Sequence, residues 1–121
     1  MTQTDKELLM KDLCARLPYG VKVKVKYYDD VWKLLAIYTN GTTYATRNIG
    51  YPIETYFEDC KPYLFPLSSM TEEQKTSHNF LKNSAYANPI KLINFYHKNH
   101  FDYNGLIPMG LANDATSKNI Y

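Results

Sequence analysis

Two histidines and an aspartate near the end of the chain are residue types that bind metal ions. His97 and His100 are three positions apart, and Asp102 follows them. Histidines at this spacing can share one helix face and hold a divalent cation. The predicted helix ends between them, however, and no motif supplies a further ligand. The sequence therefore favours two histidines at a helix C-terminus, where the helix dipole stabilises positive charge, and we expect no metal site.

The two cysteines, Cys14 and Cys60, are the candidate nucleophiles. Cys60 lies in E-D-C-K-P, where acidic Glu58 and Asp59 and basic Lys61 nearly cancel. A reactive thiolate needs a positive surround and a nearby base, so a small buried residue is the better interpretation. The sequence has no phosphate-binding loop, dinucleotide fingerprint or nucleophile elbow. We expect neither an enzyme nor a bound cofactor.

Alternating lysines in the segment G-V-K-V-K-V-K-Y-Y suggest a different chemistry, the binding of phosphate groups. Side chains alternate along a strand, so the three valines face one way and the three lysines face the other. Successive lysine stems would lie about 6.8 Å apart, close to the phosphate step of a stretched nucleic acid. Nearby tyrosines can stack on bases. The candidate binding residues are Lys22, Lys24, Lys26, Tyr28, Lys33, Tyr44 and Arg47.

Two other interpretations of these features stay open. Alternating lysines also solvate the outer face of a sheet and discourage edge-to-edge aggregation. The chain has 12 tyrosines, which strands favour in any case, but which also give a protein-binding surface large contact area at low entropic cost. A protein-binding module therefore stands beside the nucleic-acid interpretation.

Length and composition set the class of protein. The chain of 121 residues has 45% hydrophobic and 21% charged residues, which indicates one folded domain spanning residues 1–121. The net charge of +2 is too small to require a nucleic-acid partner. The polar N-terminus does not resemble a signal peptide, and no apolar run is long enough for a membrane span. With two unpatterned cysteines, this predicts a cytoplasmic protein that has no membrane partner.

The hydrophobic pattern predicts an α+β fold that positions these residues. Residues 1–17 contain a helix, residues 21–67 an antiparallel sheet, residues 69–112 helices and a docked tail, and residues 113–121 a frayed tail. In the first helix, Thr4 and Glu7 fit a capping box. Its expected buried stripe is Met10, Leu13, Cys14 and Leu17.

The predicted sheet is small and curled, with four or five strands. The expected strands are residues 21–28, 31–38, 42–47, 53–57 and 63–67, with a loop at 48–52. The second strand is apolar on both faces and should be central, whereas the prolines that flank the last strand suggest a sheet edge. Asn40-Gly41 is a hairpin turn. An SH3-like barrel and an open meander both fit this pattern.

Two C-terminal helices should follow the sheet. Ser69 with Glu72 fits a capping box for the first of them. Asn88 caps the second, with Pro89 in its first turn.

Three segments together resemble a group of small uncharacterised proteins from Bacteroidota prophages and mobile elements. They are residues 8–23 (LLMKDLCARLPYGVKV), 61–73 (KPYLFPLSSMTEE) and 99–112 (NHFDYNGLIPMGLA). The resemblance supplies no catalytic residues. It implies an inhibitor of host defence, because small mobile-element proteins without chemistry often have that role.

The leading hypothesis is therefore a non-enzymatic, anti-CRISPR-like binding protein that acts in the host cytoplasm. Its expected partner is a host protein or ribonucleoprotein, such as a CRISPR effector nuclease, and nucleic acid would be contacted through that partner. The alternative is a small module that itself binds RNA or another single strand through the lysine-rich strand and the aromatic residues.

Overall fold

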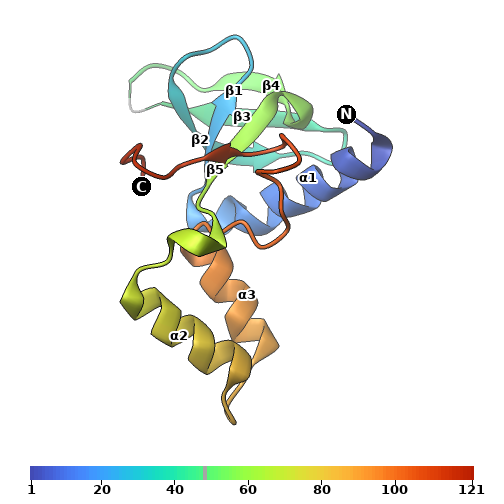
Figure 1. Cartoon of the computed structure of the whole chain (residues 1–121). Helices are drawn as coiled ribbons and strands as arrows, with labels where there is room; N and C mark the ends of the chain where they lie inside the picture. The colour runs from blue at the N-terminus through green and yellow to red at the C-terminus, as the bar shows by residue number, and fades with distance from the viewer. Residues whose placement is uncertain (48) are drawn as a thin grey trace.

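The computed structural model describes residues 1–47 and 49–121, so the predicted loop 48–52 begins outside the described residues. The fold is α+β, as predicted, with an N-terminal helix, a mixed sheet and further helices (Figure 1). The helices are α1 (Gln3–Arg16), α2 (Glu72–Asn83) and α3 (Pro89–Lys98). The strands are β1 (Lys22–Val25), β2 (Val31–Ile37), β3 (Thr42–Thr46), β4 (Ile53–Tyr56), β5 (Cys60–Leu64) and β6 (Asn113–Asp114). Short 3-10 helices are η1 (Leu17–Tyr19), η2 (Phe57–Asp59) and η3 (Leu67–Ser69).

The sheet has the strand order β4-β3-β2-β1-β5-β6 and differs from the prediction in two respects. Within the described residues it has six strands instead of four or five. It is also mixed, because β6 pairs with β5 in parallel whereas the other pairs are antiparallel. Among the described residues the sheet stays open, with β4 and β6 at its edges, so it is meander-like and the barrel alternative is wrong. The predicted central position of β2 is confirmed.

Strand β5 corrects the predicted edge strand 63–67. It begins at Cys60, and it lies between β1 and β6. Pro62 is opposite Val23 of β1, while β6 pairs with Tyr63 and Leu64. The ladder with β6 therefore begins after Pro62, whose nitrogen has no hydrogen to donate.

The valine face of β1 lies in the core, as predicted. Val21, Val23 and Val25 are almost fully buried. They pack in one cluster with residues of α1, β2, β3 and β5, which include Leu9, Leu13, Trp32, Leu34, Ala45 and Cys60. Each fully buried aliphatic side chain of this kind contributes about 1.5–3 kcal/mol of transfer free energy. The cluster joins α1 to one side of the sheet.

Helix α1 starts earlier than predicted, which changes its buried side. Thr2 is the N-cap and forms the capping box with Asp5, in place of Thr4 with Glu7. Leu9 and Leu13 face the core, whereas Cys14, predicted to be buried, is exposed. Successive helical residues lie about 100° apart, so a stripe through positions 9 and 13 turns position 14 toward solvent.

Helices α2 and α3 form a hairpin that extends away from the sheet (Figure 1). Thr71 and Gln74 make the capping box of α2, in place of Ser69 and Glu72. Asn88 caps α3 and Pro89 opens it, as predicted.

The chain then returns to the sheet, where Leu106 and Leu111 are buried beside Leu64. Residues 113–121, expected to fray, instead contact the sheet. Asn113 and Asp114 form β6, and the Tyr121 hydroxyl donates to the carbonyl of Tyr63 at 2.9 Å.

Candidate functional site

The side of the sheet opposite α1 gathers positive charge from three neighbouring strands. Lys22 of β1 lies directly opposite Lys33 of β2, and Lys24 of β1 lies directly opposite Lys61 of β5. Directly paired residues point to the same face of a sheet, so four lysine stems share the face that turns away from the valine core. Like charges directly opposite each other destabilise a sheet. The fold therefore holds an arrangement of charge that its own stability does not favour.

One end of this face is hollowed into a cavity of about 310 Å³, here called the Lys22 cavity. Its basic residues are Lys22, Lys33, Arg47 and Lys118; the others are Val31, Thr46, Asn119 and Ile120. No aspartate or glutamate lines it in the described part of the chain. Arg47 Nη1 forms a half-exposed ion pair of 2.7 Å with Asp30 Oδ2, and Asp30 does not line the cavity. The chemistry of the Lys22 cavity suits an anion.

The C-terminal segment forms one wall of the Lys22 cavity. Lys22 Nζ donates to the carbonyl of Ile120 at 2.7 Å, and the Lys22 backbone N–H donates to the Tyr121 hydroxyl at 2.8 Å. These contacts hold the Lys22 ammonium at the cavity while leaving its charge without a carboxylate partner among the described residues.

A second cavity of about 550 Å³, here called the Tyr27 cavity, lies at the other end of β1. Its lining mixes charges of both signs with an aromatic ring: Lys24, Lys26, Tyr27, Glu58, Asp59, Lys61 and Asn113. Lys24 Nζ donates to the carbonyls of Val25 and Tyr28, and the Lys26 ammonium lies 5.2 Å from the centre of the Tyr27 ring. The Tyr27 cavity thus offers hydrogen-bond donors, acceptors and a stacking surface.

The structure brings together most of the residues predicted from the sequence, but not all. Lys22, Lys33 and Arg47 line the Lys22 cavity, and Lys24 and Lys26 line the Tyr27 cavity.

Tyr28 does not extend the lysine face, because β1 ends at Val25 and the Tyr28 ring packs edge-on against the core residue Trp32, with centres 5.4 Å apart. Tyr44 lies on β3 beside Tyr38 and lines neither cavity.

Among the basic and aromatic residues of the two cavities, sequence reasoning missed Tyr27, Lys61 and Lys118. Tyr27 was not among the candidates, because the predicted strand 21–28 placed its side chain on the valine side. The strand in fact ends at Val25, and Tyr27 lies in a turn with a φ of 72°. Lys61 joins the face because β5 begins three residues before the predicted strand. Lys118 comes from the tail, and its place depends on how the tail docks, for which the local sequence carries no signal.

A buried polar cluster ties α1 to the segment after α3. Arg16 and Asp12 form a 2.8 Å ion pair with both side chains fully buried, and Arg16 Nη2 donates to the carbonyl of Phe101 at 2.6 Å. Nearby, the His100 ring stacks on Tyr121 at 3.6 Å. Burial, assisted by the positive charges of Arg16 and Lys22, lowers the pKa of His100 to about 4. This cluster is inside the protein and serves the fold.

The side chains considered above as catalytic or metal-binding candidates are buried or hydrogen-bonded within the fold. Burial, together with the charge of Asp59, raises the pKa of the Cys60 thiol to about 12, which opposes thiolate formation. His97 Nε2 shares a 2.7 Å hydrogen bond with the Tyr103 hydroxyl, and Asp102 accepts from the backbone of Leu106 and Ile107. Within residues 1–47 and 49–121, no group of three or more potential ligands could hold a metal ion.

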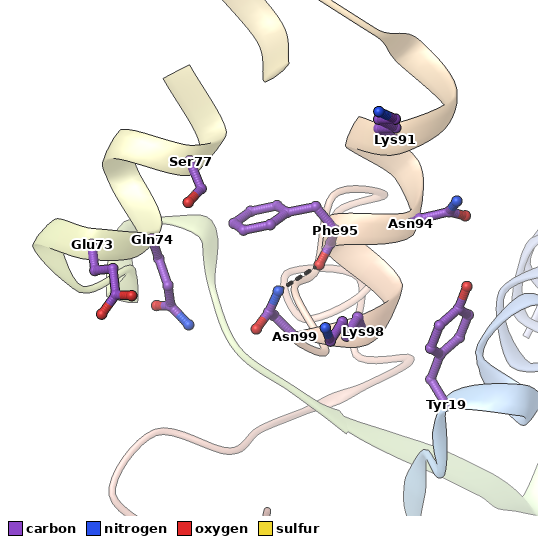
Figure 2. Close-up of a pocket in the computed structure, with 9 residues that line it drawn as sticks. All are labelled: Tyr19, Glu73, Gln74, Ser77, Lys91, Asn94, Phe95, Lys98 and Asn99. Carbon is purple, nitrogen blue, oxygen red and sulfur yellow. Dashed lines mark hydrogen bonds between the residues drawn. The ribbon is translucent and has the colours of Figure 1, made fainter. Parts of the chain in front are cut away.

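A third hollow, of about 590 Å³, lies between α2, α3 and Tyr19 (Figure 2). Glu73, Gln74 and Ser77 line it from α2, whereas Lys91 and Lys98 stand on α3, and the Phe95 ring points between the two helices. Its charged groups do not converge on one point in the view of Figure 2. We assign it no role.

No known family model matches this chain, and neither a curated protein nor a solved structure matches it. No helix in the described part of the chain combines the length and apolar character needed to cross a bilayer.

Proposed function

We propose that this protein binds nucleic acid through the basic face formed by Lys22, Lys24, Lys33 and Lys61. The observation that carries the proposal is the position of β1 inside the sheet, with a lysine opposite a lysine on each side. Lysines that protect a sheet edge belong on an edge strand, and β1 is not one. Repelling charges held on interior strands are explained by an anionic partner that neutralises them.

A phosphate backbone fits this face in spacing and in charge. Lysine stems two residues apart on one strand are about 6.8 Å apart, and the Lys22 cavity adds Arg47 and Lys118 at one end. Each phosphate neutralised by such a cation releases counterions, which gives affinity that falls steeply as salt rises.

Charge reversal on the neighbouring strands tests this proposal. Lys33→Glu with Lys61→Glu puts a carboxylate opposite each β1 lysine, an arrangement that favours the sheet, so the double variant should remain folded. We expect it to bind a fluorescent single-stranded RNA at least about tenfold more weakly than wild type in about 50 mM salt. Lys91→Glu, at an exposed position of α3, is the matched control and should bind as wild type does.

Two results would overturn the proposal. One is the absence of measurable binding of wild-type protein to RNA or DNA in about 50 mM salt. The other is equal affinity of the double variant and wild type. A wild-type affinity that does not change between about 50 mM and about 200 mM salt would likewise rule out the phosphate contacts.

A host ribonucleoprotein is the second candidate partner. The tip of the α2–α3 hairpin exposes Phe80, Tyr86 and Ile90, and the Phe80 and Tyr86 rings stack on each other at 6.0 Å. Exposed aromatic and aliphatic side chains of this kind anchor protein interfaces. With the resemblance to mobile-element proteins, this supports a non-enzymatic inhibitor that acts in the host cytoplasm on a defence complex such as a CRISPR effector nuclease.

Inhibition of such a nuclease provides the test of the second candidate. An effector loaded with its guide RNA should cleave its target more slowly when this protein is added, and Tyr86→Ser with Ile90→Ser should weaken that inhibition. Unchanged cleavage by effectors from several Bacteroidota hosts would count against this candidate. Inhibition that is equally strong with the Tyr86→Ser and Ile90→Ser variant would exclude the hairpin tip as the binding surface.

A further inference from the structure

Tyr27 is held in a backbone conformation that its side chain does not favour. Its φ is 72°, in the left-handed region, where an aromatic residue is a genuine outlier. Its side chain gains no burial in return, since Tyr27 is 89% exposed. Strained backbone positions of this kind concentrate at binding sites, where the surrounding structure maintains them.

The two cavities beside β1 differ in what they can hold. The Lys22 cavity contains cations and no carboxylate in the described part of the chain, which suits a phosphate group. The Tyr27 cavity contains Glu58 and Asp59, which repel phosphate but accept hydrogen bonds from the amino groups of bases. Asn113, Lys24 and Lys61 supply donors for base oxygens and nitrogens. Proteins commonly bind an unpaired base on a flat aromatic ring that has polar groups around it.

Lysines two residues apart on β1 line the two cavities, and this spacing matches one nucleotide step of a stretched strand. Lys22 lines one and Lys24 the other, and their stems are about 6.8 Å apart along β1. The Lys26 ammonium lies over the Tyr27 ring and is attracted to it electrostatically. Lys26 therefore contacts the ring and is not one of the donors to a base.

We propose that the Tyr27 cavity receives an unpaired base that stacks on the Tyr27 ring, while the adjoining phosphate lies in the Lys22 cavity. The inference rests on the proposed nucleic-acid function and narrows it to single strands. A duplex keeps its bases stacked inside the helix, so it can satisfy the lysines but cannot fill the Tyr27 cavity.

Replacing the ring while keeping the backbone tests the inference. Tyr27→Asn removes the aromatic surface, and asparagine tolerates positive φ, so the variant should fold. We expect its affinity for a single strand of roughly six nucleotides to fall about 5- to 100-fold, as measured by fluorescence anisotropy. Its affinity for an abasic strand of the same length, and for a blunt duplex, should not change. Tyr27→Trp keeps a stacking surface and should bind the base-bearing strand as wild type does.

Tyr56→Asn is the matched control, because Tyr56 is also exposed but lies on the edge strand β4 and lines neither cavity. It should leave all three affinities unchanged. A thermal melt of each variant separates lost binding from lost folding.

The outcomes separate this inference from the function on which it rests. Binding that depends on Lys33 and Lys61 but not on Tyr27 would overturn the base site and leave phosphate binding in place. The same holds if wild type binds the abasic and base-bearing strands equally well. Failure to bind any of the three ligands would overturn both.

Discussion

The two sides of the sheet carry opposite kinds of side chain, although the same strands form both. The side covered by α1 holds fully buried apolar residues, with Val23 and Val25 of β1 and the preceding Val21 at its centre. The open side holds lysines opposite lysines. Burial of apolar area stabilises the fold, whereas paired like charges reduce its stability.

This difference assigns different roles to neighbouring residues of one strand. Substitutions on the covered side should change the free energy of unfolding and affect binding only through folding. Substitutions on the open side should change binding and alter stability little, or even raise it. The first and the last predictions below test that division.

The largest effect should come from a pair of adjacent leucines on β2. Leu34 is 2% exposed and belongs to the core cluster, whereas Leu35 is 44% exposed, at the register shift of β2. Leu34→Ala leaves a cavity in the core and should cost about 2–5 kcal/mol of unfolding free energy. Leu35→Ala should change it by about 0.5 kcal/mol or less. Urea unfolding measures both, and similar costs for the two variants would refute the division between the sides.

A smaller effect should appear as a pH dependence that originates from His100. Its pKa is lowered to about 4 in the fold, from 6.5, mainly because the ring is buried. The unfolded chain therefore binds a proton more readily than the native protein, and stability is lost as pH falls from about 6.5 toward 4. His100 should contribute about 1–3 kcal/mol to this loss.

His100→Asn is the variant that isolates this contribution, because His100 has a φ of 60° and asparagine tolerates that region. Unfolding free energies measured at pH 7 and at pH 4.5 should differ less for the variant than for wild type. Part of the difference should remain, since burial also lowers the pKa of His78 and of His97. An unchanged pH dependence would show that His100 is not a source of acid sensitivity.

The elements that sequence reasoning predicted well depend on local signals. The alternation of valine and lysine predicted which side of β1 is buried. Asn40-Gly41 predicted the turn between β2 and β3, where Gly41 has a φ of 91° and Asn40 Oδ1 accepts from the Thr42 N–H. Asn88-Pro89 predicted the start of α3. Each signal is read from residues close together in the chain.

The elements that it predicted poorly depend on contacts between distant residues. Asn113 and Asp114 are polar and have low strand propensity, and they form β6 where the docked tail places them beside Tyr63 and Leu64. That docking also brings Lys118 to the Lys22 cavity. The sequence therefore indicated three of the four lysines of the basic face, whereas Lys61 and the neighbouring Lys118 depended on pairings that local patterns do not specify.

The smallest expected change in unfolding free energy gives the most direct test of the paired lysines on the open side. Lys33→Gln removes a charge directly opposite Lys22, beside a cavity that no carboxylate lines in the described part of the chain. The unfolding free energy should rise by about 0.2–1 kcal/mol, while affinity for single-stranded RNA falls. Lys82→Gln on α2 is the control and should change neither.

The salt dependence of stability tests whether repulsion between the lysines causes the stability gain of Lys33→Gln. Screening weakens repulsion between exposed charges, so the stability advantage of Lys33→Gln over wild type should shrink as sodium chloride is raised. If Lys33→Gln instead destabilised the protein at low salt, the lysines would be stabilising the sheet, and their arrangement would no longer require an anionic partner. A gain in stability coupled to a loss of binding is the result expected of a residue retained for recognition.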